Sequence, residues 1–178
     1  MAIVIIGKTN SGKTTLADFF PHKIVTYTTR PMRRNEVDGL DYHFVSDEIF
    51  NYLKERGVFA ETTTYKTAFG VWQYGSAKRD YEQNDDVIIL NPRGLKAVKE
   101  AGIKCFVVYL KITEEEILKR ASKRGDNKQE LLRRIKADNE DFEGIEKYCD
   151  LILETDRPEV LKERILNEYH KNNWLSCL

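Results

Sequence analysis

Cysteine is scarce in this chain of 178 residues, and neither sign of charge is in excess. The three cysteines, Cys105, Cys149 and Cys177, are widely separated and odd in number. This pattern disfavours a disulfide framework or a zinc site and indicates free thiols in a reducing cytoplasm. Lys and Arg number 29, as do Asp and Glu, so a net charge of zero gives no bulk attraction to nucleic acid or to an anionic membrane. No apolar run approaches the roughly 20 residues of a membrane span.

Proline and glycine are also few, at 4 and 10 residues, and they lie between predicted elements rather than in a linker. Hydrophobic residues make up 41% and charged residues 33%, which argues for a folded domain rather than a disordered chain. The length suits one domain, and we expect residues 1–178 to form it. The apolar start, residues 2–6, lacks the basic lead-in and cleavage site of a signal peptide and predicts a first strand.

Strand and helix patterns alternate along the rest of the chain. Continuous apolar runs, typical of strands buried on both faces, predict strands at 2–6, 87–90 and 105–110, with two more at 23–28 and 149–154. Helical patterns lie at 13–20, 47–56, 77–83, 93–101, 113–124, 127–143 and 158–172. This alternation predicts an α/β fold with a parallel five-stranded sheet and helices on both faces. Ligands of such sheets bind beyond the carboxyl ends of the strands.

Two stretches interrupt the alternation and are expected to lie over that edge. The first, about 30–76, is rich in Thr, Tyr and Phe near its end and predicts a small β-rich lobe. The second, about 120–143, predicts a helical lid. The core would then comprise about 1–29, 77–119 and 144–178.

A phosphate-binding loop is the strongest functional pattern. Residues 7–14, Gly-Lys-Thr-Asn-Ser-Gly-Lys-Thr, match G-x-x-x-x-G-K-[ST] between a predicted strand and a predicted helix. The glycines let successive N–H groups point at one anion, Lys13 places a charge on the β- and γ-phosphates, and the Thr14 hydroxyl can coordinate Mg²⁺. We therefore expect ATP with Mg²⁺ to bind at Gly7, Lys8, Thr9, Asn10, Ser11, Gly12, Lys13, Thr14 and Thr15.

Residues 25–45 are dense in groups that bind phosphate. Arg30 and Arg33 offer forked guanidinium donors, and Tyr42 offers a neutral one. By composition alone such a run is more often a solvated surface. Its order, however, closely resembles the monophosphate region of the guanylate kinase family, S-x-T-T-R-x-x-R-x-x-E-x-x-G-x-D-Y-x-F. The matching residues are Thr26, Thr28, Thr29, Arg30, Arg33, Glu36, Gly39, Asp41, Tyr42 and Phe44, with Thr26 in the usual serine position.

The resemblance continues over residues 3 to about 155. The family's F-x-E and Y-G-[ST] correspond to residues 59–61 and 74–76. Its lid arginines correspond to Arg120, Arg124 and Arg134 after one residue of deletion, which leaves Arg133 as a possible substitute for Arg134.

This resemblance implies a P-loop nucleoside monophosphate kinase that phosphorylates GMP, and also dGMP, with ATP and Mg²⁺. It implies phosphate transfer assisted by Lys13, Arg120, Arg124 and Arg134. It also implies acceptor binding by Thr26, Arg30, Arg33, Glu36, Tyr42, Glu61, Tyr74, Ser76 and Asn91.

Glu61 is the implied determinant of base choice. A carboxylate beside hydroxyl donors complements the adjacent N1–H and N2–H₂ donors of guanine and their neighbouring acceptor. Adenine would place an acceptor opposite the carboxylate, and an unpaired buried polar group costs about 1–3 kcal/mol. Guanine is therefore expected to be preferred.

Two features depart from the family pattern. The strand at 87–90 is followed by Asn91, and Ile89 and Asn91 replace an acidic pair, so Mg²⁺ is expected to depend on Thr14, phosphate oxygens and water. Glu61 and Tyr74 are 13 positions apart, several more than the family usually has, which predicts an extended hairpin over 62–72. In that hairpin Trp72 could stack on a base, although packing within the hairpin is favoured.

Other readings remain open. The missing acids allow a nucleoside monophosphate kinase of different or broader base specificity. A non-catalytic phosphopeptide-binding module of guanylate-kinase type is disfavoured by the retained phosphate loop. Neither nucleic acid nor a membrane is an expected partner, and the chain could be a monomer or a homodimer, with the role of residues 172–178 undecided.

Overall fold

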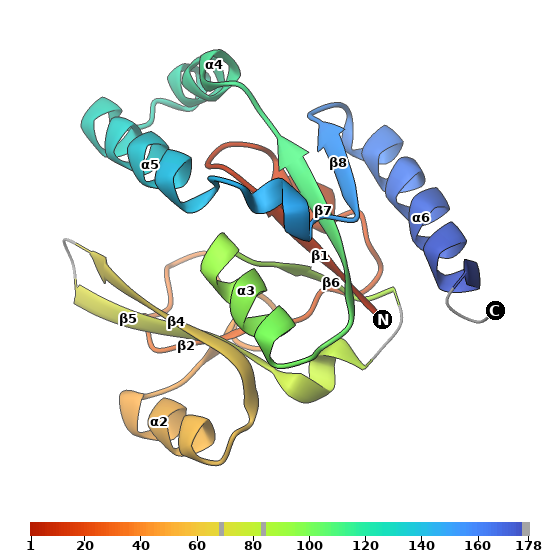
Figure 1. Cartoon of the computed structure of the whole chain (residues 1–178). Helices are drawn as coiled ribbons and strands as arrows, with labels where there is room; N and C mark the ends of the chain where they lie inside the picture. Colours follow the sequence, from red (N-terminus) through yellow and green to blue (C-terminus); the bar gives the residue numbers. More distant parts are fainter. Residues whose placement is uncertain (68–69, 83–84, 176–178) are drawn as a thin grey trace.

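The central sheet is parallel, as the alternation predicts. The computed structural model describes residues 1–67, 70–82 and 85–175. Within them the sheet has the order β6-β1-β7-β8 (Figure 1). Its strands are β1 (Ala2–Gly7), β6 (Val87–Ile89), β7 (Cys105–Lys111) and β8 (Leu151–Glu154), and all three pairings are parallel.

Strand β1 is completely buried because helices cover both faces of the sheet. Ala2, Val4 and Ile6 pack in a cluster with Leu95 and Val98 of α3 (Pro92–Glu100). The alternate residues of β1 belong to a second cluster on the other face. That cluster draws on α1 (Lys13–Ala17) and α6 (Pro158–Leu175). The period of two along β1 thus divides the core into two layers.

The predicted fifth strand is present only as an isolated bridge. Lys23 pairs in parallel with Val87, and the Ile24 N–H donates to the Val87 carbonyl at 2.8 Å. Farther along, β2 (Tyr27–Thr28) leaves the core and joins a second sheet. Residues 23–28 therefore divide between two sheets, because their last residues find partners in β3 and β5.

The second sheet has the order β3-β2-β5-β4 and carries one helix. Its other strands are β3 (His43–Phe44), β4 (Phe59–Thr67) and β5 (Gly70–Ala77). Strands β4 and β5 pair from Phe59↔Ala77 to Thr67↔Gly70, which confirms the extended hairpin; Ala68 and Phe69 lie outside the described residues. Helix α2 (Asp47–Glu55) is capped by Ser46 and buries Phe50, whose ring stacks on Phe59 at 4.6 Å.

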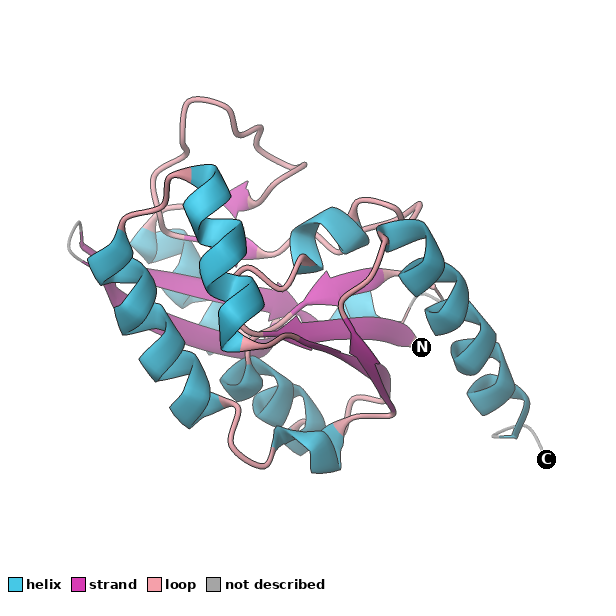
Figure 2. Cartoon of the chain, turned by 90° about the horizontal axis from the view of Figure 1, so that it is seen from above, coloured by secondary structure: helices cyan, strands magenta, loops and turns pink. Residues whose placement is uncertain are grey.

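Two helices after β7 form a third packing unit with its own apolar cluster. They are α4 (Glu114–Arg124), capped by Thr113, and α5 (Lys128–Asp141), capped by Asn127. The cluster comprises Ile112, Ile117, Ala121, Leu131 and Ile135. Figures 1 and 2 show that α6 and the β4–β5 hairpin lie at opposite ends of the molecule.

Some local predictions need correction. The helix expected at 77–83 is the short 3₁₀ turn η1 (Lys78–Tyr81), and a second such turn, η2 (Ile145–Tyr148), precedes β8. Helix α1 is shorter than expected because its capping residue is already Asp18. Cys105 and Cys149 are free thiols, whereas Cys177 lies outside the described residues. Within the described part of the chain, no helix has the length and apolar character needed to cross a membrane.

The central strand gives a direct test of the core. Ile5 is fully buried, so Ile5→Ala should lower the free energy of unfolding by about 2–5 kcal/mol through lost burial and a cavity. Ile152 on β8 is 42% exposed, and Ile152→Ala serves as the matched control, with a much smaller change expected. Urea unfolding monitored by circular dichroism measures both values. Equal losses in the two variants would contradict this packing.

Candidate active site

A cleft of about 1730 Å³ opens at the carboxyl edge of the central sheet. It is bounded by the loop after β1, the second sheet, the start of α3 and one side of α5. The site residues expected from the sequence that line it are Gly7, Thr9, Lys13, Thr26, Arg30, Arg33, Tyr42, Glu61, Tyr74, Asn91 and Arg134. Among the described residues, the lining does not include Lys8, Asn10, Ser11, Gly12, Thr14, Thr15, Glu36, Ser76, Arg120 or Arg124.

The loop between β1 and α1 has the tight curvature that its glycines predict. Asn10 and Gly12 have positive φ values, 57° and 94°. A Cβ on Gly7 would lie 2.8 Å from the Leu110 carbonyl oxygen, so only glycine fits beside β7. The loop therefore starts directly at the edge of the sheet, and Gly7, Thr9 and Lys13 line the cleft there.

Lys13 folds back over this loop. Its ammonium donates to the carbonyl oxygens of Gly7 and Lys8, at 2.7 and 2.8 Å, and to the Ser11 hydroxyl at 3.3 Å. Burial lowers the pKa of Lys13 to about 8, although the nearby Asp138 acts in the opposite direction. A lysine so placed is a desolvated positive charge at the point where an anion would enter.

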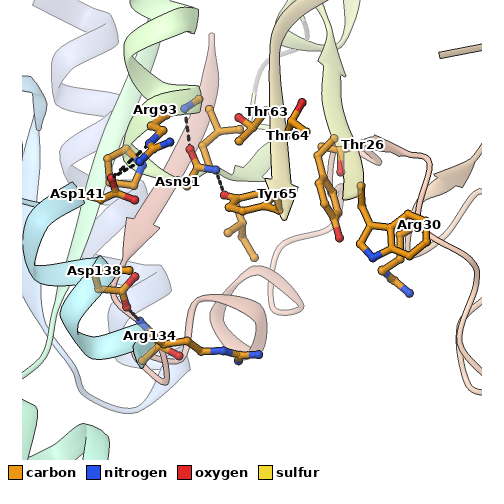
Figure 3. A pocket seen from close by; sticks show the side chains of 18 of the residues that line it. Thr26, Arg30, Thr63, Thr64, Tyr65, Asn91, Arg93, Arg134, Asp138 and Asp141 are labelled. Carbon is orange, nitrogen blue, oxygen red and sulfur yellow. Dashed lines mark hydrogen bonds and ion pairs between the residues drawn. The ribbon is translucent and has the colours of Figure 1, made fainter. Parts of the chain in front are cut away.

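Asp138 of α5 is a site residue that the sequence did not indicate. Its Oδ2 accepts a hydrogen bond of 2.5 Å from the Thr9 backbone N–H (Figure 3). Burial raises the pKa of Asp138, which the Thr9 N–H and the charge of Lys13 partly offset. Its spacing of four residues from Arg134 places both side chains on one face of a helix, the only pattern that could have suggested it.

Arg30 lies in a polar and aromatic enclosure on the opposite side of the cleft. Its Nη2 donates to Glu36 Oε1 at 2.7 Å, and the other Glu36 oxygen accepts from the Arg33 N–H at 2.8 Å. The guanidinium carbon lies 5.5 Å from the ring centre of Tyr42. The hydrogen bond from Arg30 holds the pKa of the Glu36 carboxyl below its usual value. Glu36 does not line the cleft but orients the guanidinium of Arg30. Arg30, Arg33 and Tyr42 do line it.

Glu61 of β4 is buried where the second sheet lines the cleft. Its Oε1 accepts a hydrogen bond of 3.0 Å from the Ser76 hydroxyl, and Thr63 lies 3.4 Å from Oε2. Ser76 in turn lies 2.7 Å from the Tyr81 hydroxyl. Burial raises the pKa of Glu61, and the hydrogen bonds from Ser76 and Thr63 offset this only in part. Thr63 and Tyr81 were not expected, although Thr63 follows Glu61 by two positions and so shares its strand face.

Asn91 occupies the start of α3 close to Glu61. Its Oδ1 accepts from the Gly94 N–H at 2.7 Å, and its amide nitrogen donates to the Tyr65 hydroxyl (Figure 3). Glu61 Oε2 and Asn91 Oδ1 both lie within 3.4 Å of the point that a Gly94 side chain would occupy. Gly94 therefore leaves room for these two groups to approach. Through Tyr65 the extended hairpin contacts the start of α3. The sequence had not indicated this contact.

The expected lid arginines have different surroundings. Arg120 donates to Glu116 at 3.1 Å and to the Asn10 carbonyl oxygen at 3.1 Å, so it contacts the loop. Arg133 and Arg134 both bind Glu130, at 2.8 and 2.9 Å, and both line the cleft. Arg124 is exposed outside the cleft. The structure thus brings Arg134 and its alternative Arg133 to the site and leaves Arg124 apart.

A phosphate loop facing a small second sheet across a cleft, beneath two helices, defines a P-loop nucleoside monophosphate kinase. A profile described as guanylate kinase matches residues 1–167. The chain belongs to the guanylate kinase family, whose enzymes phosphorylate GMP with ATP.

Individual relatives agree with this assignment. A guanylate kinase from Syntrophus aciditrophicus is 32% identical over 176 residues, covering 92% of this chain and 82% of that protein. One from Helicobacter pylori is 30% identical over 178 residues, covering 93% and 84%. A crystal structure of guanylate kinase from Anaplasma phagocytophilum has a TM-score of 0.70 at 21% identity, over 97% of this chain and 85% of that one, and shares the fold.

The buried ammonium of Lys13 predicts a pH-dependent stability. Its pKa is about 8 in the folded protein and 10.5 for a free lysine, so between these values the unfolded chain binds more protons. The free energy of unfolding should therefore rise between pH 8 and 10.5, by on the order of 3 kcal/mol from this group. Urea unfolding of nucleotide-free protein at pH 8 and pH 10 measures the increment.

Lys13→Met should remove that increment, whereas Lys54→Met, at an exposed site on α2, should retain it. Identical pH dependence in the native protein and Lys13→Met would show that Lys13 is not desolvated.

Proposed function

We propose that this protein transfers the γ-phosphoryl group of ATP to GMP, with the residues assigned below. The observation that carries the proposal is the cleft itself. One side presents a phosphate loop with the buried Lys13, and the other presents the buried carboxylate Glu61 beside the hydroxyls of Thr63 and Ser76. The first suits a polyphosphate, and the second suits a base with adjacent hydrogen-bond donors.

The acceptor phosphate is assigned to Arg30, Arg33, Tyr42 and Tyr74. Support comes from their convergence on the cleft and from Glu36, which fixes the guanidinium of Arg30. A planar guanidinium held in this way can bind two phosphate oxygens at little entropic cost. Because none of these contacts involves the 2′ position of the sugar, we extend the proposal to dGMP.

Guanine is assigned to Glu61, with Thr26 and Ser76 completing the contacts. Ser76 already donates to one carboxylate oxygen, which leaves the second oxygen toward Thr63 and the cleft. Asn91 is a neutral replacement for an acid, and its Oδ1 caps α3, so its contribution to the base would come from the amide N–H₂. With this acid replaced, the guanine preference would rest mainly on Glu61.

Positioning and charge stabilisation account for the catalysis. A phosphate oxygen of the acceptor attacks the γ-phosphorus in line, the bond from that phosphorus to the β–γ bridging oxygen breaks, and ADP leaves. Lys13, Arg120 and Arg134 stabilise the negative charge on the transferring group, and Arg133 is equally placed to act. Arg124 would need the lid to close further before it could contribute. We assign residues 30–76 and 120–143 as the lobe and lid that move to exclude water.

The cofactor is assigned as Mg²⁺ bound with ATP. The Thr14 hydroxyl is exposed at the start of α1, and oxygen donors of this kind suit a hard cation. Among the described residues no three acidic, His or Cys side chains gather into a metal site, so phosphate oxygens and water would supply most ligands. The ion supplies charge neutralisation between the phosphates. We also expect the protein to work in the cytoplasm, a reducing compartment in which the free thiols of Cys105 and Cys149 would persist. We expect it to be a monomer or a homodimer.

An acceptor screen tests the assignment of the base. With ATP and Mg²⁺, GMP and dGMP should be phosphorylated far faster than AMP, UMP or dTMP in a coupled assay of ADP release. Glu61→Gln should lower kcat/KM for GMP about 100-fold, because the buried carboxylate no longer accepts from N1–H and N2–H₂. Glu55→Gln, an exposed change on α2, is the control and should leave kcat/KM unchanged. Unaltered selectivity in folded Glu61→Gln would place the base elsewhere.

The donor site has a separate test. Lys13→Met should lower kcat about a thousandfold, since the charge at the transferring phosphoryl group is lost, while GMP binding measured by calorimetry stays near the native value. Lys54→Met again provides the exposed control. A native turnover rate in Lys13→Met would contradict the mechanism.

A further inference from the structure

The lid helices dock directly on the phosphate loop. The Lys8 ammonium donates to Asn139 Oδ1 at 2.6 Å, and the Asn10 amide donates to Asp126 at 3.3 Å. Between these two contacts, Asp138 accepts from the Thr9 backbone N–H. Only the third contact engages a main-chain donor of the loop, and it lies inside the cleft.

Asp138 takes the place of an anion at this loop. Its carboxylate is half-buried, bonds to the Thr9 N–H at 2.5 Å, and experiences the charges of both Lys13 and Lys8. Backbone N–H groups of this loop are the donors that phosphate oxygens require. A triphosphate that accepts a hydrogen bond from the Thr9 N–H must therefore displace the Asp138 carboxylate or bind close to its negative charge.

The two other acids of α5 that line the cleft, Glu130 and Asp141, are paired with arginines instead. Glu130 is paired with Arg133 and Arg134, and Asp141 is paired with Arg93 at 3.1 Å (Figure 3). Within the described part of the chain, Asp138 forms no ion pair with an arginine, and its carboxylate instead accepts from the Thr9 backbone N–H. Its negative charge is thus directed at the donor site rather than neutralised by a neighbouring arginine.

The charge of the incoming donor decides how strongly Asp138 opposes it. Metal-free ATP carries two more negative charges than ATP bound to a divalent cation. Repulsion between like charges a few ångströms apart is large in a partly desolvated cleft. The same carboxylate is compatible with a donor whose phosphates are already neutralised by a cation.

We propose that Asp138 is a specificity-determining residue of the donor site, which holds the Thr9 amide in the empty protein and selects the cation-bound triphosphate over the metal-free one. This role rests on the proposed function. It also compensates in part for the acids that are absent at Ile89 and Asn91, because it returns a negative charge to the cleft from the lid side.

Calorimetric binding of ATP to the full chain tests the proposal without any turnover. Each protein is titrated with ATP in EDTA and with ATP in MgCl₂, in the absence of GMP. Asp138→Asn should bind metal-free ATP about tenfold more tightly than the native protein does, with a smaller change for magnesium-bound ATP. The ratio of the affinity for magnesium-bound ATP to that for metal-free ATP should therefore fall. Asp138→Ala should lower it in the same way, which separates charge from hydrogen bonding.

Glu140→Gln is the matched control, since Glu140 is exposed on the same helix and does not line the cleft. It should keep the native ratio. A native ratio in both folded Asp138 variants would overturn the role of Asp138 while leaving the proposed function intact. If the native protein bound ATP in neither condition, the donor site and the proposed function would fail together.

Discussion

Parallel pairing of β1 with β6 and β7 is the constraint on which the site depends. Because these strands run in one direction, the chain leaves each of them at the same edge of the sheet. The phosphate loop follows β1, Asn91 follows β6, and helices α4 and α5 follow β7. Complete burial of β1 between two helical layers fixes the position of Gly7, and the contact of Gly7 with β7 leaves no room for a side chain. Three separate parts of the chain thus converge without any direct link in sequence.

Buried charges make this cleft electrostatically asymmetric. On the side of the second sheet, Arg30 is paired with Glu36, while Glu61 has neutral partners: the hydroxyls of Ser76 and Thr63 and the Ser76 backbone. On the side of the phosphate loop, Lys13 has three oxygen acceptors, and Asp138 accepts from the Thr9 backbone N–H. Groups that lack an opposite charge keep much of their desolvation penalty, and under the proposed function the substrates would supply charge or hydrogen-bond partners to them. Such groups lower the free energy of unfolding of the ligand-free protein at the points where ligands are expected to bind.

The extended β4–β5 hairpin gives the second sheet a contact with the start of α3. In this chain β4 carries Glu61, Thr63 and Tyr65 on one face, and the last of these reaches Asn91 at the start of α3. A neutral amide is well suited to this position, because an additional carboxylate beside the buried Glu61 would be repelled. The loss of the family's acid and the extension of the hairpin therefore meet at one contact, in which the amide of Asn91 has partners on both sides.

The sequence by itself determined the layered α/β fold, the phosphate loop and most of the residues that line the cleft opposite that loop, since these depend on local spacing. The apolar runs at β1, β6 and β7, the caps Ser46 and Thr113, and the motif at residues 7–14 each act within a few residues of chain. Only the tertiary structure decided that residues 23–28 divide between two sheets, that Asp138 reaches Thr9, and that Tyr65 reaches Asn91. Those outcomes join residues 16 or more positions apart. They depend on how helices and sheets pack, which no local pattern of residues specifies.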